Sequence, residues 1–346
     1  MKTQATGNMV RLGLVGVGSW GEQVALSAAL DSGVELVACY ARTAEAREAF
    51  AVRHGCWASV SYEEMLAEPS IQGIVVMSAN RAHRGHVEAA AAAGKHVLVT
   101  KPIATTIADG QAIIEACRRA GVILAVGHQS RREPAIRRLK ALLVDGTIGR
   151  PVMVEANIST AVGTTVRPDQ WRWLREECPG GPLMQLGIHH LDTLQYLLGP
   201  IEQVVGWQRR SLVQAEIDDV TATLLAFAGG ITGYLGAGYA SSQACWIKVY
   251  GTAYVAHYDQ HLGLTLSNDT WATGPVRRDE APGIPLLPPI PTMREEVSEF
   301  TECIRSGKPP EIDGEQALRN LAVVLAAVRS QTQSRAVAVA EILEGG

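Results

Sequence analysis

The sequence predicts an α/β protein with two domains, a doubly wound parallel sheet followed by an α+β domain with a large, open and mostly antiparallel sheet. The chain has 346 residues, which is longer than the roughly 100 to 200 residues of one domain. Up to residue 126, apolar runs alternate with amphipathic segments, a pattern typical of repeated βαβ units. Beyond it, strand-like runs follow one another directly. The domains are therefore predicted at residues 1–127 and 128–346.

In the first domain, the apolar runs predict parallel strands. These runs are VRLGLVG, VELVACY, GIVVMS, HVLVT and VILAVG. The amphipathic segments at 44–54, 83–93 and 107–120 predict helices that are long enough to cross back over the sheet between consecutive strands.

In the second domain, a helix over 134–145 is followed by the stop signal IGRP, because Gly and Pro end helices. The strand-like runs that follow are PVMVEANIS, IEQVVGWQ, DVTATLLAFA, ITGYLGAGYA and CWIKVYG. Neighbouring strands of this kind pair antiparallel, within an open mixed sheet. One helix over 183–198 interrupts the series, and the Pro-rich stretch APGIPLLPPIPT predicts an extended connection before helices at 293–305 and 315–332.

Composition limits the classes of function. Hydrophobic residues make up 47% and charged residues 19% of the chain, a globular balance. The net charge is −4 and the basic residues are scattered, so we expect no nucleic-acid partner. The six cysteines form no CxxC pair, which predicts free thiols and no metal site. The N-terminus lacks the features of a signal peptide, and no apolar window is long enough for a membrane span, so we expect a cytoplasmic protein without a membrane partner.

The turn after the first predicted strand carries a glycine motif. Gly16, Gly18 and Gly21 form GxGxxG, in which the glycines permit a tight turn, close approach of a pyrophosphate, and close packing of helix on strand. Ser19 and Trp20 begin the helix, whose free N–H groups attract phosphate. This predicts a Rossmann dinucleotide site; the alternative is a tight turn between two core elements.

The end of the second strand favours NADP(H) over NAD(H). It reads Tyr40, Ala41, Arg42, Thr43, where an NAD enzyme usually carries an acid for the ribose hydroxyls. Arg42 is able to pair with a 2′-phosphate and Thr43 to donate a hydrogen bond to it. The alternative is that Arg42 only stacks on the adenine, which leaves NAD(H) possible.

Six motifs, the glycine motif included, follow one another along the chain in a characteristic order. They are GLVGVGSWG, SANRAH, GKHVLVTKP, GHQSRREPA, GTIGRP and PGGPLMQLGIHHLD, and the tail IRSGKPPEIDGEQALRNLAVVLAAVRS adds to them. With these motifs the sequence resembles the Gfo/Idh/MocA family, the group that contains glucose-fructose oxidoreductase and inositol dehydrogenase, over nearly its whole length. The resemblance implies a Rossmann domain followed by an open-sheet domain, and hydride transfer between nicotinamide and a hydroxyl or carbonyl carbon of a sugar, cyclitol or related polyol.

The resemblance also implies the catalytic residues. Lys101 matches the family's catalytic lysine, which hydrogen-bonds the reacting oxygen and lies beside the cofactor, and His189 matches its catalytic histidine, a general base. Asp192 lies three residues further along the same helix face, where it orients the ring or binds substrate, and His190 is predicted to be structural. A solvated lysine and a core histidine are the alternatives.

The sequence departs from the family pattern at two positions. Gln185 stands where many relatives carry an aspartate one turn before the histidine, and Thr100 replaces the glutamate of EKP. Gln185 is still able to hydrogen-bond substrate or orient His189, and Thr100 is still expected beside the cofactor. Both departures put the substrate in doubt more than they do the redox chemistry.

Further site residues are implied by the other motifs. Those expected near the nicotinamide ribose are Ser78, Asn80 and His83, and those expected near substrate are His128, Gln129, Arg131, Trp171 and Arg172. The alternative for the run Trp171–Trp173 is a hydrophobic plug.

The family commonly forms dimers or tetramers through its exposed sheet face, so the resemblance implies a homo-oligomer. Three alternatives to the sugar or polyol dehydrogenase remain: a dihydrodiol dehydrogenase of the same fold, a redox-assisted glycosidase that retains NAD, and a cofactor-binding sensor without catalysis.

Overall fold

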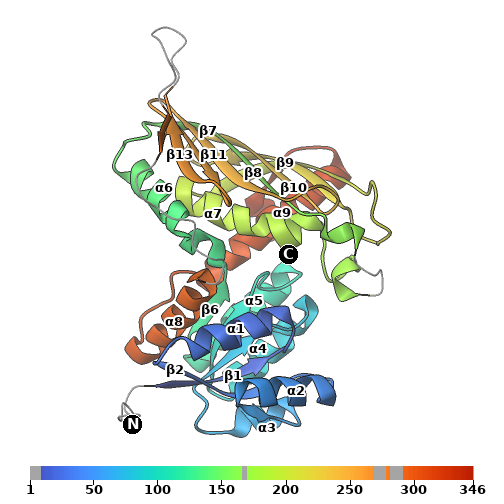
Figure 1. Ribbon diagram of the computed structural model, residues 1–346. Coiled ribbons are helices and arrows are strands. Elements are labelled where there is room, and N and C mark those ends of the chain that lie inside the picture. Colours follow the sequence, from blue (N-terminus) through green and yellow to red (C-terminus); the bar gives the residue numbers. More distant parts are fainter. Residues whose placement is uncertain (1–8, 166–169, 269–277, 281–290, 346) are drawn as a thin grey trace. The chain divides into compact units, whose positions relative to one another are not determined.

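The computed structural model describes residues 9–165, 170–268, 278–280 and 291–345. Within these ranges the chain forms two compact units (Figure 1). The first is Met1–Gln129 with Pro289–Leu318, and the second is Ser130–Pro288 with Arg319–Gly346. The Pro-rich connection lies outside the described residues up to residue 290.

The first unit contains a parallel sheet. Its strands are β1 (Val10–Val15), β2 (Val34–Tyr40), β3 (Trp57–Ala58), β4 (Gly73–Val76), β5 (His96–Thr100) and β6 (Leu124–Gly127). They follow the spatial order β3-β2-β1-β4-β5-β6, with every described pair parallel. This is the doubly wound order of a dinucleotide-binding fold, in which ligands bind beyond the carboxyl ends of the strands.

Helices cover both faces of this sheet. They are α1 (Ser19–Ala29), α2 (Ala44–His54), α3 (Tyr62–Ala67), α4 (His83–Ala92), α5 (Ile107–Ala120) and α8 (Pro291–Ser306). Local hydrogen bonds and backbone conformation determine where helix α5 begins and ends. The Thr106 hydroxyl accepts a hydrogen bond from the Asp109 backbone N–H at 3.1 Å, and Gly121, with φ of 66°, ends the helix.

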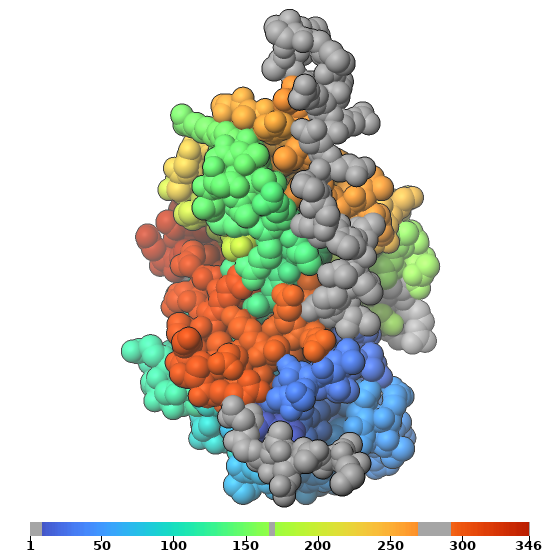
Figure 2. Space-filling view, turned by 60° about the vertical axis from the view of Figure 1, so that its left-hand side comes forward, coloured from blue at the N-terminus to red at the C-terminus, as the bar shows by residue number. Residues whose placement is uncertain are grey.

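Helix α8 belongs to the first unit, although it lies far along the chain. Met293, Val297 and Phe300 are buried in one hydrophobic cluster with Leu12 and Leu14 of β1. The orange-red residues of α8 lie against the blue residues of α1 in Figure 2. The sequence predicts a continuous second domain at 128–346, whereas this segment packs into the core of the first unit. The reason for the difference is that an amphipathic pattern predicts a helix without identifying the core that buries it.

The second unit contains a mixed sheet. Its strands are β7 (Pro151–Ser159), β8 (Ile201–Arg209), β9 (Val220–Phe227), β10 (Thr232–Gly238), β11 (Ala244–Gly251), β12 (Val255–Asp259), β13 (Gly263–Ser267), β14 (Arg278–Glu280) and β15 (Val337–Ala338). Among the described residues, the pair β7–β10 is parallel and the other pairs are antiparallel. The predicted fold class is confirmed.

The helices of this unit cover one face of its sheet (Figure 1). They are α6 (Pro134–Val144), α7 (Ile188–Leu198), the part of α9 (Gly314–Gln333) from Arg319 onward, and α10 (Val339–Glu344). Short turns lie at Val162–Thr164 and Trp171–Trp173, and the turn Gln129–Arg132 begins with the last residue that this part of the chain gives to the first unit. Exposure alternates along β9, where Thr223, Leu225 and Phe227 are buried while Leu224 is exposed. The sheet thus has a covered face and an open face.

The predicted helix over 183–198 is two elements. Leu183–Gly187 forms a π-helical turn and α7 follows it directly. The turn is packed tightly: a Cβ on Gly187 would lie 2.6 Å from Leu183 Cδ1 and 3.5 Å from the Ala237 side chain of β10. Such turns are rare and occur frequently at functional sites.

Among the described residues, none of the helices combines the length and the apolar character needed to cross a bilayer.

If α8 is an integral part of the first core, Phe300→Ala should lower the free energy of unfolding by about 3–5 kcal/mol, because it removes a fully buried aromatic ring. Chemical denaturation followed by circular dichroism measures the change. Glu302→Ala is the matched control on the same helix, since Glu302 is exposed and its pair with Arg305 contributes below about 1 kcal/mol. Equal effects of the two substitutions would contradict this packing.

Candidate functional site

Two of the three motif glycines are required by the protein's own packing. Gly16 has φ of +96°, and a Cβ there would lie 2.5 Å from the Met77 carbonyl oxygen. A Cβ on Gly21 would lie 2.2 Å from the Gly16 carbonyl oxygen. The Gly16 amide donates to the Tyr40 carbonyl at 2.9 Å, so the turn also ties the end of β1 to the end of β2.

Gly18 is different, because packing within the protein gives no reason for a glycine there. It is the N-cap of α1, and a Cβ on it would meet no described atom within 4 Å. Ser19 and Trp20, the next two residues, are exposed. Open space over a helix N-terminus with free N–H groups fits a pyrophosphate that approaches the backbone closely. The residues present therefore fit a dinucleotide.

Aromatic rings gather beside the end of β2. Tyr40 stacks on Tyr62 with ring centroids 6.0 Å apart, and Tyr62 meets His86 edge-on at 5.0 Å. The Tyr62 hydroxyl donates to the His86 carbonyl at 2.7 Å, and burial raises the pKa of Tyr62. Tyr40 is predicted from the sequence, whereas Tyr62 and His86 are not, because their approach depends on tertiary structure.

The residues that follow Tyr40 at the end of β2, Ala41 to Thr43, carry no carboxylate. Arg42 and Thr43 are both exposed, and Thr43 is the N-cap of α2, although its hydroxyl makes no capping bond to the helix. Arg47 donates to the Ala41 carbonyl at 3.3 Å, which holds this segment in place. The two predicted cofactor side chains are thus displayed at the surface of the first unit.

The loop after β4 is fixed by two histidines. The Ser78 hydroxyl lies 3.0 Å from His86 Nδ1. His83 is fully buried, with Nδ1 2.9 Å from the Pro102 carbonyl oxygen and Nε2 3.2 Å from the Ser78 carbonyl oxygen. Burial lowers its pKa to about 4 despite these contacts. His83, predicted near the ribose, therefore ties the β4 loop to the segment after β5, and the neighbouring Asn80 is also buried.

Lys101 lies directly after β5, at the carboxyl edge of the parallel sheet. Thr100 ends the strand, both side chains are half-buried, and the Lys101–Pro102 peptide is cis. Open α/β sheets place their ligands at this edge. The same edge carries the glycine turn after β1.

In the second unit, His189 is the second residue of α7, immediately after the π-helical turn, and is only 7% exposed. Its neighbour His190 is also buried, with Nε2 3.1 Å from the Asn157 carbonyl oxygen of β7. Burial lowers the pKa of His190 to about 4, so the ring is neutral at neutral pH. His190 thus holds α7 against the sheet, as a structural histidine would.

Gln185 lies within the π-helical turn and forms bonds inside the unit. Its Nε2 donates to the Arg172 carbonyl at 2.6 Å and to Cys178 Sγ at 2.7 Å. The amide therefore connects the π-helical turn to the Trp171–Trp173 turn, in addition to the substrate contact that the sequence predicts.

The Trp171–Trp173 turn combines both interpretations of its sequence. Trp173 is buried and meets the Tyr239 ring at 5.2 Å, as a hydrophobic plug does. Trp171 and Arg172 are half-buried, and the guanidinium lies 4.6 Å from the indole centroid. An aromatic face beside a cation suits a polyhydroxylated ligand.

Asp192 and Arg131, both predicted near substrate, form an ion pair with each other. Arg131 Nε and its terminal nitrogen lie 2.7 and 2.5 Å from the two Asp192 carboxylate oxygens, and both side chains are buried. His128 is fully buried at the end of the first unit and Gln129 beside it is half-buried.

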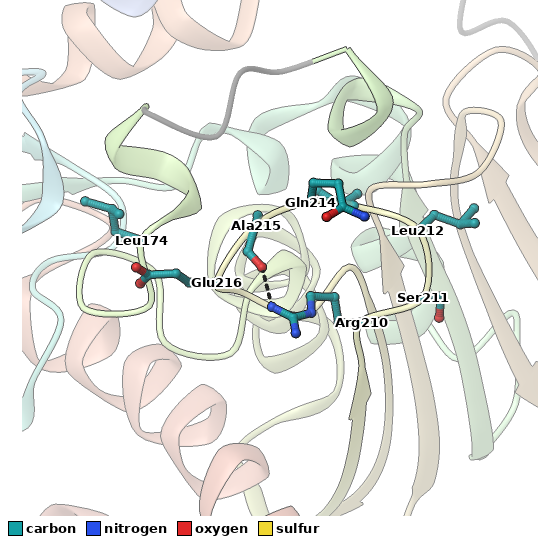
Figure 3. A pocket seen from close by; sticks show the side chains of 8 residues that line it. Leu174, Arg210, Ser211, Leu212, Gln214, Ala215 and Glu216 are labelled. Atoms are coloured by element: carbon teal, nitrogen blue, oxygen red, sulfur yellow. Dashed lines mark hydrogen bonds between the residues drawn. The ribbon is translucent and has the colours of Figure 1, made fainter.

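An open cavity of about 510 Å³ lies against the loop between β8 and β9. Leu174 and residues 210–216 line it, and Arg210 donates to the Ala215 carbonyl at 2.7 Å (Figure 3). The loop is anchored by Asp219. Although burial favours the neutral form, three backbone N–H groups (Ser211, Leu212 and Val213) donate to this carboxylate and lower its pKa. None of the predicted site residues lines this cavity.

Among the described residues, no group of three or more His, Cys, Asp or Glu side chains is placed to hold a metal ion.

Comparison with known proteins identifies the family. Residues 10–128 match the oxidoreductase family with an NAD-binding Rossmann fold, and residues 136–256 match the GFO/IDH/MocA C-terminal domain. The chain is 29% identical to 1,5-anhydro-D-fructose reductase from Ensifer adhaerens over 95% of this chain and 98% of that protein. It is also 29% identical to D-xylose 1-dehydrogenase [NADP(+)] from Haloarcula marismortui, over 95% and 93% of the two chains.

A solved structure from Desulfitobacterium hafniense is similar throughout. It carries the provisional name of an NADPH-dependent oxidoreductase, is 33% identical, covers 97% of this chain and 99% of its own, and superposes with a TM-score of 0.91. The matches to both domains and this identity confirm the predicted resemblance: the chain belongs to the Gfo/Idh/MocA family of NAD(P)-dependent oxidoreductases.

Proposed function

We propose that this enzyme transfers hydride between NADP(H) and the carbinol or carbonyl carbon of a sugar, cyclitol or related polyol. The observation that carries the cofactor part is the open space over Gly18 at the N-terminus of α1, where packing within the protein gives no reason for a glycine. The substrate class is supported by the names of the sugar reductase and sugar dehydrogenase that resemble the chain over most of its length.

Two side chains perform the proton chemistry in this proposal. In the oxidation direction the carbinol C–H bond breaks with loss of hydride, the O–H bond breaks with loss of a proton, and the carbonyl C=O bond forms. His189 accepts the proton, and Lys101 donates a hydrogen bond to the reacting oxygen. When bound, nicotinamide accepts that hydride, or supplies it in the reverse direction. In the reduction direction His189 returns the proton, while Lys101 donates its hydrogen bond to the carbonyl oxygen.

The preference for NADP(H) depends on the end of β2. Arg42 and Thr43 are exposed there, and no carboxylate stands at Tyr40–Thr43 to repel a 2′-phosphate. Tyr40, stacked on Tyr62, supplies an aromatic surface for the adenine.

Among the described residues the six cysteines form no disulfide bond, which suits a reducing compartment, and we expect the enzyme to work in the cytoplasm.

Arg42→Ala should raise the Kd for NADPH about 10- to 100-fold and change the Kd for NADH by less than about twofold, because only the 2′-phosphate loses a charge-assisted hydrogen bond. Fluorescence titration with each reduced nucleotide measures both constants. Arg118→Ala removes another exposed arginine, on α5, and should change neither. Equal losses for the two nucleotides would discredit the phosphate contact.

Lys101→Ala and His189→Ala should each lower kcat by about 100-fold or more, because each removes a group that handles the reacting hydroxyl. Absorbance at 340 nm follows turnover of D-xylose, myo-inositol and a trans-dihydrodiol with NADP⁺, and of 1,5-anhydro-D-fructose with NADPH. Lys308→Ala and His261→Ala, at exposed positions, are the controls.

Full turnover in either catalytic variant would reject the assigned roles. Wild-type hydrolysis of an aryl glycoside without release of reduced cofactor would favour the redox-assisted glycosidase. NADPH binding without turnover of any of these compounds would favour the sensor.

We also propose that a second copy of the chain covers the open face of the second sheet. Trp207 (53% exposed), Leu224 (43%), Tyr234 (37%) and Met153 (38%) belong to this face. Leu224 lies opposite Tyr234 across β9 and β10, and Tyr234 lies opposite Glu155 of β7. These side chains form an apolar strip with charged neighbours at Glu155 and Lys248, and the same strip of a second copy is the partner that we propose for it.

Trp207→Glu should therefore convert the oligomer to a smaller species at micromolar concentration, because the substitution buries a charge at the interface. Light scattering after size-exclusion chromatography measures the mass. Val52→Glu, at an exposed apolar position on α2, should leave the mass unchanged. A wild-type monomer, or a Trp207→Glu variant of wild-type mass, would refute this assembly.

A further inference from the structure

The Asp192 carboxylate is held by more than its partner arginine. Asn320 of α9 donates from Nδ2 to Asp192 Oδ1 at 2.9 Å, beside the two bonds from Arg131. The three residues are at most 6% exposed, and all belong to the second unit. A buried carboxylate is stable only when paired and hydrogen-bonded, so these donors determine where this turn of α7 lies.

The orientation of the Asn320 amide is determined by a chain of hydrogen bonds. The Ile201 backbone N–H donates to Gln195 Oε1 at 3.1 Å, so the other end of the Gln195 amide must be its nitrogen. That nitrogen donates to Asn320 Oδ1 at 2.7 Å, which leaves Asn320 Nδ2 to donate to Asp192. One backbone N–H at the start of β8 thus fixes the direction of every bond in the chain.

Asn320 thereby bridges two successive turns of α7, because Asp192 and Gln195 are three residues apart on one helix face. His189 lies three residues before Asp192 in the same row. It is also the second residue after the π-helical turn, where the backbone changes from one helical register to another. The first turns of α7 set the position of the His189 ring, and Asn320 and Arg131 hold those turns from two other segments.

Asn320 is a polar residue in a stretch of α9 whose other buried residues are apolar. Leu318, Leu321, Ala322, Val323 and Val324, its neighbours in α9, are all buried and apolar. An asparagine in that stretch is costly unless its amide is satisfied, and an apolar residue of similar size would pack well.

We infer that Asn320 is a positioning residue for His189, acting through Asp192. The inference rests on the proposed catalytic role of His189 for its kinetic consequence, while its structural part concerns the placement of the His189 ring alone. Two measurements are therefore needed, one on the ring and one on turnover.

The first measurement is the NMR spectrum of the full-length protein labelled with ¹⁵N- and ¹³C-histidine. The chain has nine histidines, and the His189 ring signals are those absent in His189→Gln. Asn320→Leu should shift the His189 signals, because the first turns of α7 lose one of the contacts that hold them. Ser330→Ala is the matched control, since Ser330 is a buried polar residue of the same helix that bonds Gly206 and Arg335 rather than α7.

The second measurement is steady-state turnover of 1,5-anhydro-D-fructose with NADPH. Asn320→Leu should lower kcat about 10- to 100-fold, as misplacement of a reacting group by about 1 Å does, with the KM for NADPH changed by less than about twofold. Ser330→Ala should keep both within about twofold, even if it lowers the melting temperature equally.

If the Asn320→Leu variant does not fold, Asn320→Asp is the variant to measure. It keeps the hydrogen bond from Gln195 but places a second carboxylate beside Asp192. It should lower kcat at least as much. The exchange Asp192→Asn with Asn320→Asp restores one carboxylate next to one amide, so it should retain more activity than the two single effects predict together.

Unchanged His189 signals in Asn320→Leu, or additive effects in the exchange, would overturn the inference. So would equal loss of kcat in Asn320→Leu and Ser330→Ala. Full turnover in His189→Ala would instead reject the proposed function, and the histidine spectrum would still decide whether Asn320 places the ring.

Discussion

The turn at Gly16 is the constraint on which the first unit's site depends. Its amide bonds the Tyr40 carbonyl at the end of β2, and its Cα lies so close to the Met77 carbonyl, after β4, that no side chain fits. The ends of three neighbouring parallel strands are therefore brought together at one point. Every cofactor residue that the sequence suggests ends or follows one of these strands or β5, so the chemistry of the site is a consequence of how closely the strands approach there.

A buried charge plays the corresponding role in the second unit. The Asp192 and Arg131 pair is costly to desolvate, and such pairs contribute little net stability compared with apolar residues of the same volume. They do impose geometry, because a misplaced partner leaves an unpaired charge in the interior. The Arg131 guanidinium also lies 5.2 Å from the Tyr196 ring centroid, where α6 and α7 meet, so the pair is built into the packing of these helices.

Much of this organisation could be predicted because it is encoded locally. A strand, three glycines and a helix are contiguous, so the turn at Gly16 is recognisable from the sequence alone. The π-helical turn at Leu183–Gly187 was not predicted, because apolar periodicity indicates a helix without resolving its register. Asn320 was missed for another reason: its partner Asp192 lies 128 residues earlier in the chain, and an isolated asparagine in an apolar helix carries no sign of such a bond. The packing of α8 into the core of the first unit could not be predicted either, because its partners in β1 also lie far away in the sequence.

One of the two departures from the family pattern, Gln185, acquires a physical meaning from the second unit. An aspartate at position 185 would offer two acceptor oxygens, whereas Gln185 uses its nitrogen as a donor to the Arg172 carbonyl and to Cys178. A carboxylate cannot make either bond. Gln185 therefore replaces a charge near α7 with a connection to the Trp171–Trp173 turn. Substrate selectivity in this enzyme should then depend on how that turn presents the Trp171 indole and the Arg172 guanidinium, rather than on a carboxylate that binds hydroxyl groups directly.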